Sequence, residues 1–407
     1  MPDLNPEILL WARETAGLSL QEAASKLGID DARGVPGAER LAALEAGERQ
    51  PSRPLLLKMA KQYRRPLLTF YLPAPPRMGE RGQDFRSLPP EHSRRDDALV
   101  DTLVRDVRAR QGMVRALLEA EDEAHPLPFV GSMAMRDGAT AVLASIMQVL
   151  GLDRSQFRHG LSQNRHAKKG FPYLREQAER AGIFVLLMGN LGSHHTSLDL
   201  EAFRGFALAD PVAPFIVIND QDADTAWSFT LLHELAHIWL GQTGVSGAAP
   251  TTALEQFCND VAGNFLLPFE EIAQEQALKH ALFDGVVRRI GEIAEAYKVS
   301  HSLVAYKLFR SNIITRDMWG QVSRFYRQKW LASRAGSKKD REASKGPDYY
   351  VVRRHRIGRR LLSLARRMLE DGALAPSKAG RILGVRPTNV YALVDEAGRP
   401  AAVSARS

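Results

Sequence analysis

The chain has 407 residues, of which 44% are hydrophobic and 25% are charged, and its net charge at pH 7 is +8. This length is too great for one compact domain, and the composition excludes a chain that is disordered throughout. The single cysteine, Cys258, excludes a disulfide framework and a structural zinc site made of several cysteines. No apolar run suits a membrane span or a signal peptide, so we expect a cytoplasmic protein without membrane contacts.

Four short helices are predicted at the N-terminal end from the helical spacing of apolar residues. They cover residues 6–16, 20–27, 38–46 and 54–63. Ser19 and, three residues later, Glu22 form the capping box that opens the second of these helices.

Two runs of this region, GLSLQEAASKLGI and LAALEAGERQPSRPLLLKMAKQYRRPL, resemble the Cro-repressor-like (XRE) helix-turn-helix family over residues 5–72. The resemblance implies a DNA-binding domain whose third helix enters the major groove. In this chain that helix offers mainly Ala, Leu and Glu, with Arg40 and Arg49 as its strong hydrogen-bond donors. Double-stranded DNA contacted by these two arginines is therefore one expected partner. A helical protein-interaction domain is the alternative.

The middle of the chain changes from helices to short strands and back. After a proline-bracketed linker, amphipathic spacing predicts a long helix at 96–123 and a shorter one at 140–150. Apolar runs predict strands at 183–188, 204–209 and 215–218, and the Asp210-Pro211 turn joins the last two as a hairpin. A cluster of Asn and Asp then precedes a helix predicted at 223–240.

The helix at 223–240 carries the stretch His233-Glu234-Leu235-Ala236-His237. Residues four apart share a helix face, so both imidazoles can bind one metal ion while Glu234 lies beside an open coordination position. This is the H-E-x-x-H pattern of metal hydrolases. The alternative is a pair of core histidines, which would bury polar groups at a cost on the order of several kcal/mol unless they had partners.

A third ligand is needed, because a catalytic zinc takes three protein ligands and keeps water in the fourth position. Glu255 lies in the helical run ALEQFCNDVAGNFLLP, far enough after His237 for the chain to return to the first helix. Asn259 shares the face of Glu255 and would hydrogen-bond a ligating histidine. This order of motifs is the gluzincin arrangement, and Asp260 is the alternative third ligand.

Further short motifs surround these residues. They are Arg204-Gly205-Phe206, Ala213-Pro214, Ile218-Asn219, Phe229-Thr230, Ile238-Trp239, Cys258-Asn259 and Leu266-Leu267-Pro268. Together with the H-E-x-x-H stretch they closely resemble the ImmA/IrrE family of zinc metallopeptidases over residues 170–275. The resemblance implies zinc bound by His233, His237 and Glu255, with Glu234 as the catalytic base. It also implies intracellular cleavage of a transcriptional repressor or regulator, and an upstream Cro-like domain is a common companion.

In this hypothesis Glu234 takes the proton of the attacking water and passes it to the leaving amine. The developing oxyanion needs a further donor, which the sequence does not single out. Residues of suitable type are Tyr297, His280, His194 and His195. Cys258, three residues after Glu255, is either a small packing residue or a thiol near the zinc that acts as a redox switch.

The C-terminal third carries most of the surplus positive charge. Two helices predicted within 283–309 either complete the peptidase core or form a helix-turn-helix-like pair. Basic residues greatly outnumber acidic ones between 324 and 367, and Arg353, Arg354 and Arg356 are predicted to contact nucleic-acid phosphates. The run LAPSKAGRILGVRPTNVYALVDE predicts a small helix-turn-helix-like unit with Gly384 in its turn. A solvated basic face and an acidic protein partner are the alternatives.

These patterns predict an α+β fold that is mostly helical, with a zincin-like core of a short β-sheet and the H-E-x-x-H helix, flanked by helix-turn-helix-like domains. We expect a zinc-dependent endopeptidase that cleaves an intracellular regulatory protein. The alternative is a DNA-binding transcriptional regulator whose peptidase-like domain is a sensor with little hydrolysis. The predicted domains are a Cro-like domain (1–75), a helical linker region (76–155), a zinc metallopeptidase core (156–282), a helical extension (283–330), a basic linker (331–348) and a basic C-terminal domain (349–407).

Overall fold

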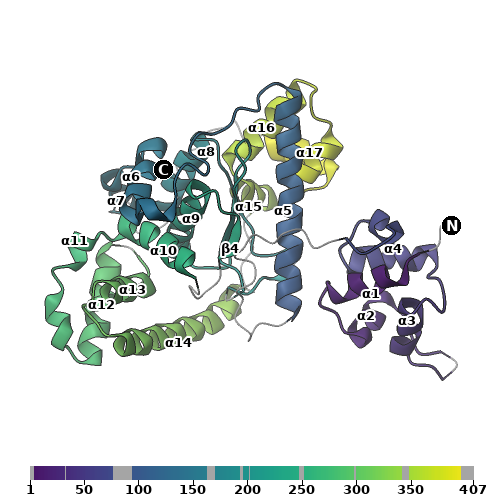
Figure 1. Ribbon diagram of the computed structural model, residues 1–407, viewed down its shortest axis with the longest axis horizontal. Coiled ribbons are helices and arrows are strands. Elements are labelled where there is room, and N and C mark those ends of the chain that lie inside the picture. Colours follow the sequence, from purple (N-terminus) through teal and green to yellow (C-terminus); the bar gives the residue numbers. More distant parts are fainter. Residues whose placement is uncertain are drawn as a thin grey trace, which may run out of the picture. The chain divides into compact units, whose positions relative to one another are not determined.

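The computed structural model describes residues 4–32, 34–76, 94–162, 170–192, 196–200, 202–246, 252–297, 299–341 and 348–395 (Figure 1). It is mostly helical with one small β-sheet, which confirms the predicted α+β class. The chain divides into two compact units, residues 1–107 with 190–203 and residues 108–189 with 204–407. Each unit has its own hydrophobic core. Within the described ranges, no helix has both the length and the apolar character needed to cross a membrane.

The N-terminal unit contains a small helical domain built as the apolar spacing predicted. Its elements are α1 (Pro6–Glu14), α2 (Leu20–Leu27), α3 (Gly37–Glu45), α4 (Arg53–Gln62) and the 3-10 helix η1 (Leu67–Tyr71). Both bonds of the predicted capping box form, since Ser19 Oγ accepts from the amide of Glu22 at 3.2 Å and the Glu22 carboxylate accepts from the amide of Ser19 at 2.9 Å. A largely buried ion pair between Arg13 and Glu45, at 2.8 Å, joins α1 to α3.

The second unit contains a four-stranded sheet in the order β1-β3-β2-β4. Its strands are β1 (Phe184–Leu187), β2 (Gly205–Leu208), β3 (Phe215–Ile218) and β4 (Gly244–Ser246). The predicted hairpin is confirmed, because β2 pairs antiparallel with β3 and Gly205 lies opposite Ile218. β1 runs parallel to β3, and β4, which the sequence did not indicate, pairs antiparallel with β2. The side chains of β1, β2 and β3 are all buried, as expected for continuous apolar runs covered on both faces.

One helix, α9 (Asp224–Trp239), occupies the centre of this unit and packs against β2 and β3. It is surrounded by α6 (Ala139–Leu150), α8 (Gly170–Arg180) and α10 (Ala253–Leu266) (Figure 1). Its last carbonyl groups accept hydrogen bonds from the amides of Gly131 and Met133 at 3.0 and 3.1 Å, so its C-terminal end is satisfied by backbone. Trp239 stacks on Phe129 with ring centroids 4.5 Å apart, which fixes the same end by packing.

The other helices of the chain complete the fold. They are α5 (Arg94–Ala120), η3 (Met135–Asp137), α7 (Arg154–Ser162), α11 (Phe269–Ile272), η5 (Gln276–His280), α12 (Phe283–Tyr297), α13 (His301–Arg310), α14 (Arg316–Arg341), α15 (Tyr349–Ile357), α16 (Arg359–Glu370), α17 (Pro376–Leu383), η6 (Pro387–Asn389) and α18 (Val390–Val394). The division of the chain between residues 107 and 108 falls within the sequence of α5. α14 continues through the first part of the segment expected to be a basic linker.

The C-terminal bundle, residues 348–395, is held against the edge strand β1 by the buried side chain of Arg175. The Arg175 guanidinium donates to the carbonyl of Val185 on β1 and to the carbonyl of His355 in the last turn of α15. It also pairs with Glu179 at 3.2 Å. A cation at a helix C-terminus is favourable. The Arg175 side chain therefore provides a hydrogen-bond donor both to a carbonyl of the sheet edge and to a carbonyl at the end of α15. Burial lowers the pKa of Arg175, while Glu179 acts in the opposite direction.

Candidate metal centre

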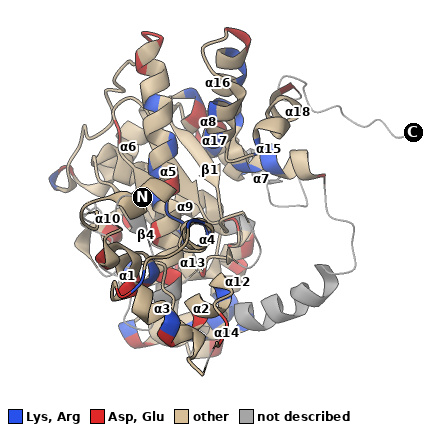
Figure 2. Cartoon of the chain, turned by 90° about the vertical axis from the view of Figure 1, so that its right-hand side faces the viewer, with Lys and Arg blue, Asp and Glu red and all other residues tan. Residues whose placement is uncertain are grey.

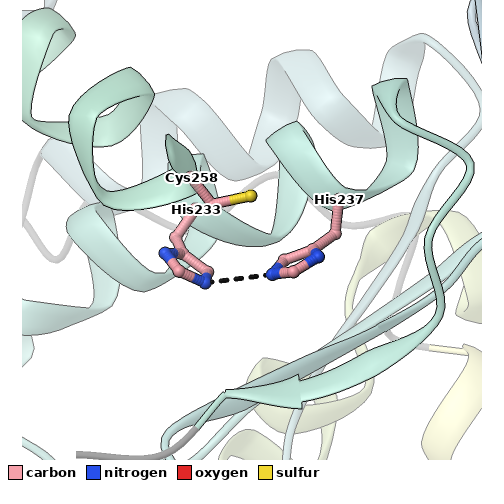
Figure 3. Close-up of side chains that lie close together, drawn as sticks. All are labelled: His233, His237 and Cys258. Carbon is pink, nitrogen blue, oxygen red and sulfur yellow. Dashed lines mark hydrogen bonds between the residues drawn. The ribbon is translucent and has the colours of Figure 1, made fainter. Parts of the chain in front are cut away.

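Three side chains from two helices converge at one point. His233 and His237 lie four residues apart on α9, and their Nε2 atoms are 3.1 Å from each other. Glu255 on α10 places Oε2 3.2 Å from Nε2 of His233 and Oε1 3.2 Å from Nε2 of His237. The two imidazoles face each other in Figure 3. The two ring nitrogens and the two carboxylate oxygens predicted from the motif spacing therefore form one cluster, in which each atom lies within 3.2 Å of another.

The N-terminal part of α10 positions Glu255 and Asn259. Thr252 is the N-cap of this helix, and its Oγ1 accepts from the amide of Glu255 at 3.2 Å. One turn later, Oδ1 of Asn259 lies 2.9 Å from Nδ1 of His233. Asp260, the alternative third ligand, is directed to α13, where Tyr306 donates to it at 3.1 Å and Arg310 pairs with it at 2.6 Å.

The contact with Asn259 sets the tautomer of His233. Because an amide oxygen can only accept, Nδ1 of His233 carries a proton and Nε2 of the neutral ring presents its lone pair. That lone pair points at a carboxylate oxygen of Glu255 only 3.2 Å away. Two acceptors at this distance repel unless a proton or a metal ion lies between them.

All the polar groups of this site are withdrawn from solvent. His233 is 4% exposed, Glu255 is 8% exposed, and Glu234 and His237 are fully buried. Burial opposes the imidazolium form of His233, but Glu255 and then Glu234 outweigh burial, so the pKa of His233 is raised. Burial likewise opposes the Glu255 carboxylate, but its close contacts with the two histidines hold the pKa of Glu255 well below its usual range.

The spacing of these donors suits a tetrahedral metal ion. A zinc ion bound at about 2.0–2.1 Å separates its N and O donors by about 3.3 Å, close to the distances of 3.1 and 3.2 Å found here. Among the described residues, Oε1 of Glu255 has no hydrogen-bond partner although it is buried. A cation would compensate that atom and remove the repulsion at Nε2 of His233.

Cys258 adds a further donor beside the same two histidines. Its Sγ and the ring nitrogens of His233 and His237 lie within 4.8 Å of one another, and Figure 3 shows the sulfur close to both rings. Two sets of donors therefore share the histidines, one completed by Glu255 and the other by Cys258. The carboxylate set is the tighter one, because both its oxygens are within 3.2 Å of a ring nitrogen. The spacing of three residues from Glu255 was the sequence signal for this proximity.

Glu234 faces the first residue of β2. A Cβ atom on Gly205 would lie 2.8 Å from Oε1 of Glu234 and 2.6 Å from Cγ2 of Thr230. Real Cβ atoms are not found that close to other atoms, so the carboxylate occupies space that only glycine leaves open. The motif Arg204-Gly205-Phe206 was noted in the sequence, but its contact with Glu234 depends on tertiary packing and has no local signal.

The predicted nucleic-acid contacts lie elsewhere, and most are engaged within the protein. Arg40 donates to the carbonyl of Asp30, whereas Arg49 is exposed after α3. Arg353 donates to the carbonyl of Gly384, Arg354 donates to Ala392 at 3.5 Å, and Arg356 pairs with Asp220 at 2.6 Å. Nucleic-acid contact by these arginines stays a prediction.

The residues considered as oxyanion donors are spread over several elements. Tyr297 lies under the guanidinium of Arg158, 5.3 Å from its ring centroid, and burial followed by Glu271 raises the pKa of Tyr297. His280 is exposed at the end of η5. His194 and His195 lie outside the described residues.

A helix bearing H-E-x-x-H, a carboxylate from a later helix and a small sheet beside them are the arrangement of zincin-type metallopeptidases. Residues 178–309 match the family model Peptidase_M78, the IrrE N-terminal-like domain. The matched segment includes α9 and α10 and supports the resemblance to the ImmA/IrrE family. Comparisons with curated proteins and with solved structures found no match.

Proposed function

We propose that this protein is a zinc-dependent endopeptidase that cleaves an intracellular regulatory protein. The observation that carries the proposal is the convergence of His233, His237 and Glu255 next to the buried carboxylate of Glu234. The match of this segment to a peptidase family supports it. Zinc suits the donor set, because two imidazoles and one carboxylate leave a fourth position open for water.

In this proposal His233, His237 and Glu255 hold the metal, and Asn259 keeps Nε2 of His233 directed at it. A bound zinc supplies a Lewis acid that polarises the scissile carbonyl and acidifies water. Glu234 accepts the water proton at its carboxylate and returns it to the leaving nitrogen. Burial favours this transfer, because little solvent competes for the proton at Glu234.

The sheet has two edge strands, β1 and β4, and only β4 is proposed to receive an extended substrate. The edge strand β1 already contacts Arg175 and α15. β4 is the edge strand that directly follows α9, and it pairs with β2 only, within the described residues. A peptide that adds to β4 would run beside the metal donors, with main-chain hydrogen bonds supplying affinity. The choice of a transcriptional repressor as the substrate rests on the resemblance to the ImmA/IrrE family, which the family match at residues 178–309 supports.

A second candidate is a regulator whose peptidase-like domain senses a signal and hydrolyses little. The burial of Glu234 and His237 favours it, because both side chains are fully buried and a peptide reaches them only when neighbouring residues move. In this case the metal centre would be structural, and DNA or protein binding would be the activity.

Metal content and cleavage together test the proposal. We expect the purified protein to contain about one zinc per chain, and Glu255→Ala to lose it. We also expect the zinc-loaded protein to create new termini in a library of proteome-derived peptides, and a chelator to abolish this. Zinc binding without any cleavage would favour the sensor instead. A protein that binds no zinc would contradict both candidates.

A further inference from the structure

The last part of the C-terminal bundle consists of two short helical segments joined by a tight turn. α17 ends at Leu383, Gly384 adopts a left-handed conformation with φ of 67°, and η6 and α18 follow from Pro387. Their apolar residues, including Ile382, Leu383 and Leu393, are buried within the bundle. Helix, glycine turn and helix in this order are the arrangement that places a second helix in the DNA major groove.

Most arginines of α15 and α16 face inward or toward neighbouring parts of this unit. Three of them donate to backbone carbonyls: Arg353 to Gly384, Arg354 to Ala392 and Arg360 to Glu179. Two donate to carboxylates: Arg356 to Asp220 and Arg367 to Glu123. The high charge of these two helices therefore serves mainly to hold the bundle in place.

A different set of basic residues faces solvent. Lys378, Arg381 and Arg386 are exposed, and none of their side chains makes a hydrogen bond or ion pair with another residue of the described chain. Between residues 372 and 394 there is no Asp or Glu. The basic residues of the bundle are blue in Figure 2. By contrast, residues 1–76 contain ten basic and nine acidic residues, so the N-terminal domain has almost no net charge.

Side chains suited to reading bases lie beside these cations. Thr388 is exposed, Asn389 is half-buried, and Tyr391 is 54% exposed. Asparagine can bind adenine through two hydrogen bonds, arginine can bind guanine likewise, and threonine can contact either base edges or phosphates. Apart from Tyr391, this surface has no large exposed apolar side chain, which a protein partner would need as an anchor.

We propose that this surface, made of Lys378, Arg381, Arg386, Thr388, Asn389 and Tyr391 and here called the basic face, binds double-stranded DNA. Lys378 and Arg381 contact phosphates, while Arg386 and Asn389 reach base edges in the major groove. Double-stranded DNA fits better than RNA, because a helix enters the wide major groove of B-DNA and not the narrow one of A-form RNA. This DNA contact does not require hydrolysis, so it holds for either candidate function.

Binding of the full-length protein to a fluorescent random-sequence duplex of about 24 base pairs, at about 50 to 200 mM salt, tests the basic face. Wild type should bind, with an affinity that falls steeply as salt rises. K378E/R381E/R386E should weaken binding at low salt at least about tenfold. It should lower the salt slope by about 2, since the phosphate contacts of Lys378 and Arg381 contribute about 0.9 each. Its melting temperature should be unchanged, because all three side chains are exposed.

Two matched variants make the result specific. R136E/K279E/R288E makes the same charge change at exposed residues of η3, η5 and α12 and should bind nearly as wild type does. R40E/R49E tests the N-terminal domain and should also retain binding. The proposal is overturned if wild type does not bind at low salt or if the basic-face variant binds normally. Equal weakening by R136E/K279E/R288E, or equal competition by single-stranded RNA, would overturn it too.

Discussion

Replacement of Asn259 by alanine tests how the metal centre is organised. Oδ1 of Asn259 lies 2.9 Å from Nδ1 of His233 and holds the proton on that nitrogen, which leaves Nε2 as the proposed metal donor. Without this acceptor, the His233 ring is no longer held in place with its proton on Nδ1. Metal binding must then supply the free energy to orient the ring and to move the proton to Nδ1. Loss of such a partner typically costs about 10- to 100-fold in metal affinity, which corresponds to about 1.4–2.8 kcal/mol.

The assay is a zinc competition titration against a chelator of known affinity, with the wild type and Asn259→Ala measured side by side. Asn259→Asp is the matched control, because its carboxylate still accepts from Nδ1 of His233 and should keep affinity within a few-fold of wild type. Far-ultraviolet circular dichroism of both variants confirms that α10 is intact. Unchanged zinc affinity in Asn259→Ala, with normal folding, would refute the role given to this hydrogen bond.

Three further predictions concern packing, the anchor of the bundle and metal removal. Gly205→Ala brings a Cβ within 2.8 Å of Oε1 of Glu234. Cleavage should therefore fall at least about tenfold, while zinc content is unchanged. Gly112→Ala is the neutral control, because a Cβ at Gly112 would meet open space. Equal cleavage by both variants would count against the contact with Glu234. Arg175→Met leaves Glu179 buried without its cation and should lower the free energy of unfolding in urea by about 3–5 kcal/mol, and R175M/E179L should recover much of the loss. A single variant as stable as wild type would contradict this. Chelation should lower the melting temperature, because metal that binds only the folded state stabilises it; an unchanged melting temperature would argue against metal in the native protein.

The proposed metal donors could be predicted from the sequence because the polar residues of both helices are spaced four apart, so each pair lies on one helix face. His233 and His237 share one helix face by their spacing of four, and so do Glu255 and Asn259. The apolar faces of α9 and α10 then bury these pairs against each other. Local periodicity therefore determined which side chains could meet, as long as the two helices packed.

Features that depend on tertiary contacts were not predictable in the same way. The contact of Gly205 with Glu234 depends on how β2 passes α9, and β4 is too short to show an apolar pattern. The positive charge of residues 324–367 led to the prediction that Arg353, Arg354 and Arg356 contact nucleic acid. A sequence shows how many charges a segment carries, but not which residues pair with them in the folded chain. Asp220, the partner of Arg356, is more than a hundred residues away in the chain.

Cleavage by Glu234→Gln is the most direct test of the proposed mechanism. Glutamine has nearly the same shape, so the variant should fold normally and bind the same amount of zinc as wild type. It has no carboxylate to accept the water proton, and general base catalysis contributes about 10²- to 10⁴-fold, so cleavage of the peptide library should fall by at least that order. If zinc-loaded Glu234→Gln cleaves at the rate of wild type, the role assigned to Glu234 is wrong.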